Sequence, residues 1–198
     1  MGLQGLDFSF YDNFYHLIPS WRSMQVEMRQ EDYLSGKYLE ILRRGHEIVE
    51  KEGAIEFWRI RNKRLSDVLT TGSGILVVTG RVIGILERYG FTGWRKFKVV
   101  IKDKKKGVIS EGYWGISVVS NILRRRRDLY REVVEERLNG TKKIRKFGWY
   151  FEPEDWDGSD FNLLGGVSLI VTKRVKDVFE KEKVKNISID SVHDIEIF

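Results

Sequence analysis

The sequence predicts an α+β fold with a mixed or antiparallel sheet, a strand–helix–strand unit that occurs twice, and one longer helix. Three observations support this prediction. Short apolar runs typical of strands alternate with amphipathic segments typical of helices. Residues 77–91 and 170–184 resemble each other in the phase of their apolar positions. Residues 121–138 form the longest stretch with helical spacing of apolar side chains.

The two similar segments are VVTGRVIGILERYGF and IVTKRVKDVFEKEKV. They are identical at five of fifteen positions, namely Val78/Val171, Thr79/Thr172, Arg81/Arg174, Val82/Val175 and Glu87/Glu180. Each segment predicts an apolar strand, a threonine whose hydroxyl caps the next helix, and a short amphipathic helix. We interpret the match as an internal duplication with units at 75–101 and 168–197. Convergence of two capped amphipathic helices is the alternative.

The N-terminal third is predicted to contain an aromatic element, a helix and a strand. Residues 8–15 are rich in Phe and Tyr and indicate a strand or an anchored arm, which ends at Pro19. The apolar residues of 36–52 fall near one helix face, and Gly53 stops that helix. The run 54–60 predicts a strand.

Short elements surround the first unit in the middle of the chain. Residues 65–70 predict a helical turn, and Thr71–Gly74 predicts a glycine-rich turn. The first unit then supplies strands at 75–79 and 94–101, followed by a charged turn at 102–107 and a strand at 112–119.

The predicted long helix, 121–138, begins at Asn121 and ends at Asn139–Gly140. Its expected apolar face consists of Ile122, Leu129, Val133, Val134 and Leu138. A basic loop at 141–146, a strand at 147–151 and an acidic loop up to Asp160 follow. The chain thus divides into an N-terminal arm, helix and strand (1–64) and an α+β region (65–198), which we expect to form one compact domain.

Charge and cysteine content limit the classes of function. The net charge is +6, but residues 91–150 hold 17 Lys/Arg against 6 Asp/Glu, so the middle of the chain is strongly basic. Such asymmetry favours a polyanionic or acidic partner, with a solvated surface as the alternative. The absence of cysteine excludes disulfides, zinc ribbons and cysteine nucleophiles. Without an apolar run of about 20 residues, we expect a cytoplasmic protein that does not bind a membrane.

Residue patterns that carry chemistry are sparse. No P-loop, dinucleotide-binding or nucleophile-elbow pattern occurs, and His16, His46 and His193 lie in three different predicted elements. The acidic run EPEDWDGSD (152–160) places its glycine too early for a calcium loop. We therefore expect no enzyme activity, no metal site and no cofactor. A tryptophan among acidic residues instead suggests a partner-binding loop, whose candidate residues are Trp156, Asp157, Gly158 and Asp160.

Three basic clusters form a second candidate surface. Their residues are Lys104, Lys105, Lys106, Arg124, Arg125, Arg127, Lys142 and Lys143. If the clusters converge, the segment 95–146 forms a nucleic-acid-binding module, whose affinity falls steeply with salt. Four successive arginines cover all sides of a helical turn, so we expect one or two to pair with Glu132, Glu135 or Glu136.

The C-terminal motifs add a family resemblance. W-D-G-S-D-F (156–161), then Gly165–Gly166, then the strand and capped helix at 168–184, resemble the α+β immunity-protein family of bacterial polymorphic toxin systems, formerly a domain of unknown function. The resemblance covers about 65–101 and 147–190. It implies a protein that binds and neutralises a cognate toxin stoichiometrically, without a catalytic site. The basic net charge departs from acidic immunity proteins that mimic nucleic acid. The toxin, the interface and the oligomeric state stay open.

Overall fold

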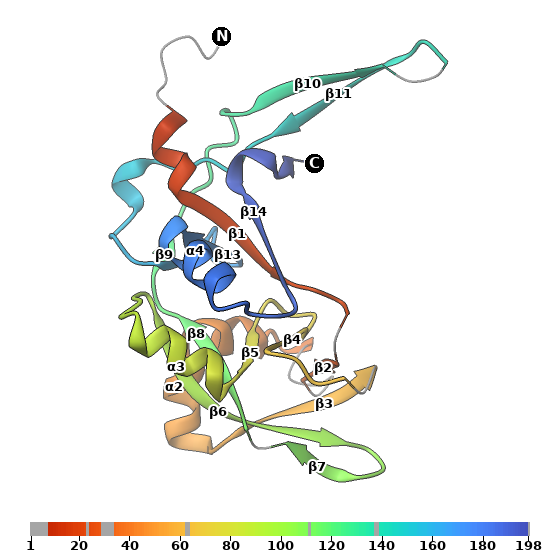
Figure 1. Cartoon of the computed structure of the whole chain (residues 1–198), viewed down its shortest axis with the longest axis vertical. Coiled ribbons are helices and arrows are strands. Elements are labelled where there is room, and N and C mark those ends of the chain that lie inside the picture. Colours follow the sequence, from red (N-terminus) through yellow and green to blue (C-terminus); the bar gives the residue numbers. More distant parts are fainter. Residues whose placement is uncertain are drawn as a thin grey trace.

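The computed structural model describes residues 8–22, 24–28, 34–61, 64–110, 112–136 and 139–197. It confirms the α+β class, because mixed and antiparallel sheets are combined with few helices (Figure 1). The α-helices are α2 (Lys37–Glu52), α3 (Gly80–Arg88) and α4 (Lys173–Lys181), and the 3₁₀ turns are η1 (Phe8–Asn13), η2 (Pro153–Asp155) and η3 (Val192–Asp194).

The strands group into three sheets. The first contains β2 (Gln25–Glu27), β3 (Ile55–Arg61), β4 (Val68–Leu69), β5 (Leu76–Thr79), β6 (Trp94–Asp103), β7 (Gly107–Ser110) and β8 (Tyr113–Val118). The second contains β1 (Phe14–Pro19), β9 (Asn121–Ile122), β12 (Phe161–Leu164), β13 (Ser168–Thr172) and β14 (Ile187–Ser191). The third contains β10 (Arg131–Glu136), β11 (Lys142–Phe147) and β15 (Glu196–Ile197).

Both predicted strand–helix–strand units are present, as β5–α3–β6 and β13–α4–β14. Each helix buries one apolar face, with Val82 and Leu86 inside in α3 and their counterparts Val175 and Phe179 inside in α4. The unit strands are not direct neighbours. Strand β8 lies between β5 and β6, antiparallel to both, and β1 lies between β13 and β14 in the same way.

In the two sheets, equivalent residues of the two units pair with equivalent positions of the inserted strands, β8 and β1. Thr79 faces Tyr113 across β5 and β8, and its counterpart Thr172 faces Phe14 across β13 and β1. At the other end, Trp94 pairs with Val118, and Ile187 pairs with Pro19. The strand inserted into the second unit is therefore the N-terminal β1, far away in sequence.

The loops after the two helices also share an unusual backbone conformation. Gly90 and Lys183, which occupy equivalent positions, have φ of 60° and 53°, and Gly93 and Asn186 have φ of 84° and 69°. A positive φ is uncommon for residues other than glycine. Its repetition at matched positions, together with the shared register, favours duplication over convergence of two amphipathic helices.

Two clusters of buried side chains hold the molecule together. The larger cluster spans both units and includes Phe57, Phe97 and Leu86, and α2 packs against β6 and β8, where Gly45 lies against the Phe97 ring. The smaller cluster is rich in aromatic residues and lies near η1, where Phe14 and Phe151 meet edge to face. The predicted N-terminal aromatic element is thus an anchor made of η1 and β1, and it ends at Pro19.

The predicted long helix over 121–138 is wrong. Residues 121–122 form β9, an irregular segment follows, and Arg131–Glu136 forms β10, which pairs with β11 in an antiparallel hairpin. Two of the expected apolar-face residues, Ile122 and Leu129, are buried, whereas Val133 and Val134 are exposed. Repulsion among four adjacent arginines opposes a helix, and the paired valines favour a strand. Among described residues, the longest helix is α2.

Three shorter predictions also need correction. Residues 65–70 contain strand β4 rather than a helical turn, because Val68 and Leu69 pair with β5. The basic loop predicted at 141–146 is mostly strand β11. The prediction of a strand at 147–151 is wrong, because β11 ends at Phe147. Further along, Phe151 makes a single bridge to Arg125. None of the described helices is long and apolar enough to cross a membrane.

Candidate functional site

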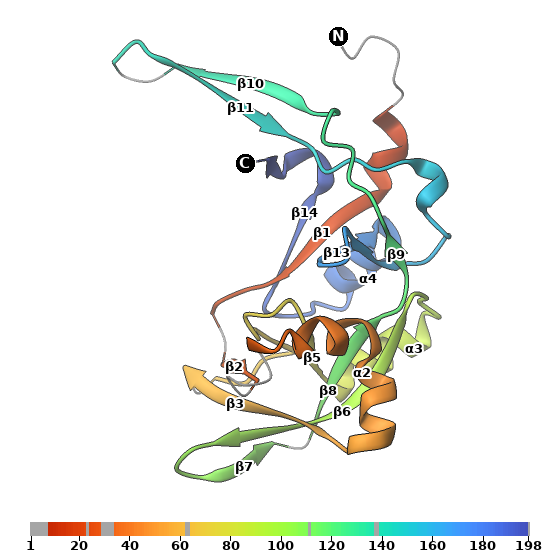
Figure 2. The same cartoon turned by 180° about the vertical axis from the view of Figure 1, so that it is seen from behind.

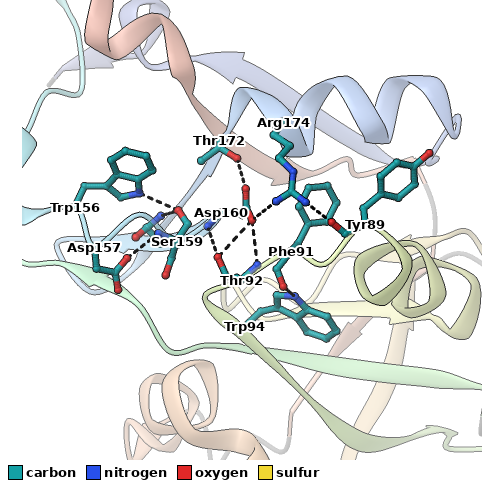
Figure 3. Close-up of polar contacts among 11 residues, drawn as sticks. Tyr89, Phe91, Thr92, Trp94, Trp156, Asp157, Ser159, Asp160, Thr172 and Arg174 are labelled. Atoms are coloured by element: carbon teal, nitrogen blue, oxygen red, sulfur yellow. Dashed lines mark hydrogen bonds and ion pairs between the residues drawn. The ribbon is translucent and has the colours of Figure 1, made fainter.

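The acidic loop places Asp160 inside a hydrogen-bonded junction between the two units (Figure 3). Its carboxylate is only 6% exposed. One oxygen, Oδ1, accepts the Thr172 hydroxyl at 2.8 Å, while Oδ2 accepts the Thr92 backbone N–H at 3.1 Å and Arg174 Nη1 at 2.8 Å. Arg174 also donates to the carbonyl of Tyr89. Thr92 and Tyr89 belong to the first unit, so Asp160 joins the two units.

A matching junction forms at Asp67, which precedes the first unit at the same spacing as Asp160 precedes the second. Arg81 donates to Asp67 Oδ2 at 2.7 Å and to the carbonyl of Glu182 at 3.1 Å. The Lys185 backbone N–H donates to Asp67 at 2.9 Å. Glu182 and Lys185 are the counterparts of the residues that contact the other junction. Each unit therefore has an Asp–Arg pair that hydrogen-bonds to the backbone at the end of the other unit's helix and in the loop that follows it. We call these two sites the Asp–Arg clasps.

The threonines that were predicted to cap the helices contribute to the clasps instead. Thr79 and Thr172 occupy the N-cap positions, but neither side chain makes a capping hydrogen bond. The Thr172 hydroxyl donates to Asp160 at 2.8 Å, and the Thr79 hydroxyl lies 3.5 Å from Asp67 Oδ1. Their identity in the two copies is explained by the clasps rather than by capping.

The other residues of the predicted partner-binding loop also make internal contacts. The half-buried Trp156 donates its indole N–H to the Ser159 carbonyl at 2.9 Å and packs edge to face on Phe14. Asp157 accepts the Ser159 backbone N–H at 2.9 Å and the Ser120 hydroxyl at 2.8 Å. Gly158 takes the left-handed conformation that the turn requires, with φ of 86°. These contacts explain the motif structurally. Partner contact through this loop stays a prediction.

The three predicted basic clusters do not converge. Lys104, Lys105 and Lys106 form the turn between β6 and β7, at the opposite end of the molecule from the β10–β11 hairpin that carries Lys142 and Lys143 (Figures 1 and 2). On the hairpin, Lys142 and Lys143 face Glu136 and Glu135 across the strands, so their charge is largely balanced. The described residues of the segment 95–146 thus offer no continuous basic surface.

The four arginines divide into one paired residue and three without a carboxylate partner among the described residues. Arg126 binds Asp128 at 2.6 Å and also binds Glu152, rather than the glutamates predicted from a helix. This pairing lowers the pKa of Asp128 to about 2. The remaining three are Arg124, Arg125 and Arg127.

These three arginines line one pocket with a volume of about 500 Å³. Its wall also includes Trp149, whose ring lies 4.6 Å from His16 on one side and 5.6 Å from the Arg125 guanidinium. The β12–β13 turn supplies the rest of the wall through Leu164, Gly165, Val167 and Ser168. The sequence indicated the arginines but not the pocket, because Trp149 and the turn are distant along the chain.

Within the described residues, the histidines belong to no group of three or more His, Asp or Glu side chains that could hold a metal ion. His16 is half-buried, and its partial burial lowers its pKa. His193 Nδ1 lies 3.0 Å from the Tyr150 hydroxyl, and its Nε2 lies 3.0 Å from Asp12. Burial raises the pKa of the Tyr150 hydroxyl at the end of this series of contacts.

The β10–β11 hairpin extends away from the body of the molecule (Figure 1). Strand β10 is an edge strand, and all of its residues are exposed. On one face, Val134 lies directly opposite Ile144, and they are 59% and 58% exposed. The cross-strand pairs Glu132–Lys146 and Glu136–Lys142 flank this apolar pair on the same face. The arrangement is a small apolar centre with a charged rim.

No protein-family model and no curated protein matches this chain. The site must therefore be interpreted from its own geometry. Among the described residues, that geometry offers the exposed β10–β11 hairpin, the arginine pocket and the two Asp–Arg clasps that join the units.

Proposed function

We propose that this chain is an immunity-type protein that neutralises a cognate bacterial toxin by stoichiometric binding, with the β10–β11 hairpin as the main contact element. The exposed Val134–Ile144 pair on the projecting hairpin carries the proposal. Protein interfaces combine an apolar centre with a polar rim, and an edge strand can add a strand of a partner. The motif resemblance to immunity proteins supports the same class of function.

The choice of hairpin face follows from the contacts on its two sides. On the face opposite to Val134, the guanidinium groups of Arg131 and Arg145 lie 5.8 Å and 5.2 Å from the Phe147 ring, and Arg145 also pairs with Glu196. That face is therefore occupied by its own side chains. The Val134–Ile144 face carries the exposed apolar area, so contact with a partner there removes apolar surface from water.

In this proposal, the acidic tryptophan loop stabilises the scaffold and does not itself contact the toxin. Asp160 is buried in a clasp, and Trp156 packs into the aromatic cluster, so their direct contact with a toxin would require the loop to rearrange. We assign these residues to the scaffold that holds the binding surface in place.

The test is co-expression with the product of the adjacent open reading frame, scored by bacterial growth, and calorimetry of the purified pair. We expect the neighbour to be toxic alone and harmless together with this chain. Val134→Asp places a charge in the apolar centre, so we expect about 10- to 100-fold weaker binding and loss of protection.

Val108→Asp is the matched control, because Val108 is 50% exposed on β7 at the other end of the molecule. It should protect as well as the wild type does. A neighbour that is harmless alone, or that still kills in the presence of this chain, removes the proposal. Equal effects of the two substitutions would remove the role of the hairpin alone.

A further inference from the structure

The arginine pocket concentrates positive charge without an internal counter-charge. Among the described residues, its lining includes Arg124, Arg125 and Arg127 and no carboxylate. Asp128 and Glu152 pair with Arg126, the fourth arginine of the run. By contrast, the pocket beside the first clasp mixes Arg81 and Lys185 with Asp67 and Glu182. The arginine pocket is therefore not an ordinary salt-bridged surface.

Packing holds the central arginine in place. Arg125 is partly buried, its guanidinium lies over the Trp149 ring at 5.6 Å, and its backbone forms a bridge to Phe151. Burial, with the nearby charge of Arg127, lowers the pKa of Arg125. Holding like charges together costs free energy in the empty pocket, and an anion between them would relieve that cost. A preorganised guanidinium also loses little side-chain entropy on binding.

We propose that this pocket binds the di- or triphosphate group of a small phosphorylated ligand, for which inorganic pyrophosphate is the simplest probe. Guanidinium groups recognise phosphate oxygens through paired, charge-assisted hydrogen bonds. A volume of about 500 Å³ suits a small molecule. The exposed side chains of Leu123 and Val167 at the pocket would contact the organic part of such a ligand.

A small ligand fits better than a nucleic-acid strand. A strand needs a basic track along several nucleotides, whereas the other basic clusters lie at the two ends of the molecule (Figures 1 and 2). The proposal is independent of toxin binding, because the pocket and the Val134–Ile144 face share no residue.

The experiment is isothermal titration of the whole chain with pyrophosphate, ATP and a single-stranded oligonucleotide at about 50 mM salt. We expect pyrophosphate to bind at one site and ATP to bind at the same site. Arg124→Gln/Arg127→Gln should weaken both by at least ten-fold, and both arginines are exposed, so the variant should fold. Arg125→Lys keeps the charge but loses the planar fork, so it should weaken binding as well.

Lys104→Gln/Lys105→Gln is the matched control, because it removes two exposed positive charges at the far end of the molecule. It should leave the pyrophosphate affinity unchanged. Equal weakening in both double variants would show diffuse electrostatic attraction and overturn the proposal. Absence of pyrophosphate binding, or tight oligonucleotide binding without it, would overturn the proposal too.

Discussion

At the scale of single residues, the two clasps explain part of the sequence identity between the units. Two of the five identical pairs, Thr79/Thr172 and Arg81/Arg174, contribute side chains to the clasps. A buried carboxylate needs such partners, because an unpaired buried charge is costly. The sequence pattern singled out Asp160 as a candidate partner-binding residue. It assigned the residue to partner contact because the donors from the first unit meet it only in the folded chain.

The clasp at Asp67 should make stability depend on pH. Burial raises the pKa of Asp67, but hydrogen bonds from Arg81 and from the Lys185 backbone outweigh it and hold this pKa below its usual value. The stabilisation is therefore complete above the unfolded-state pKa of about 3.9 and is lost as the pH falls through the lower, folded-state pKa. Asp67→Asn should lower the free energy of unfolding by about 1–2 kcal/mol at pH 7.

Denaturant titrations of the wild type and Asp67→Asn between pH 7 and pH 2.5 measure this difference. We expect it to shrink below about pH 4. Asp155→Asn is the control, because Asp155 is exposed and forms no ion pair with another described residue. Its effect at pH 7 should stay within about 0.5 kcal/mol. A difference for Asp67→Asn that is constant over the whole range would contradict the role of the ionised carboxylate.

At the scale of elements, local patterns predicted what local contacts determine. The strands at 75–79 and 94–101, helix α2 and both unit helices follow from apolar spacing and stop signals. The segment 121–138 was misjudged because Val133 and Val134 fit either a helix face or a strand. The choice between the two depends on pairing with residues 142–147, which apolar spacing within the segment does not report.

The arginine pocket also could not be predicted from local sequence patterns alone. Its three arginines were identified from charge, but its walls come from Trp149 and from the turn between β12 and β13. The expected convergence with Lys104–Lys106 failed because β6 and β7 carry that turn to the other end of the molecule. Charge runs can therefore be found in the sequence, whereas their mutual position is set by the topology.

The hairpin should be dispensable for folding, because none of its described residues belongs to either buried cluster. Replacing residues 133–145 by Asn-Gly keeps the Arg131–Phe147 pair and provides a two-residue turn. We expect the free energy of unfolding to change by about 1 kcal/mol or less, since the main ion pair lost, Arg145–Glu196, is only half-buried. Thermal unfolding measures this, and a molten or aggregated product would contradict it.

At the scale of the whole molecule, the two units are interlocked rather than adjacent. The N-terminal β1 completes the sheet of the second unit, whereas β8, which follows the first unit in the chain, completes the sheet of that unit. The N-terminal third, 1–64, is thus divided between the units, because β2 and β3 join the first sheet. In each unit, the strand that lies between the two strands of the unit comes from outside the strand–helix–strand segment. Folding of one unit therefore requires distant parts of the chain.

This interlocking predicts how the chain behaves when it is cut between Ser110 and Tyr113. Fragment 1–111 retains β5, α3 and β6 but lacks β8, and fragment 112–198 retains β13, α4 and β14 but lacks β1. Each fragment leaves an apolar gap at the centre of its sheet, so we expect neither to unfold cooperatively alone. Mixing should restore a 1:1 complex with a single unfolding transition, because each fragment supplies the other's central strand. Circular dichroism and analytical ultracentrifugation measure this, and a fragment that folds alone as a monomer would contradict the strand exchange.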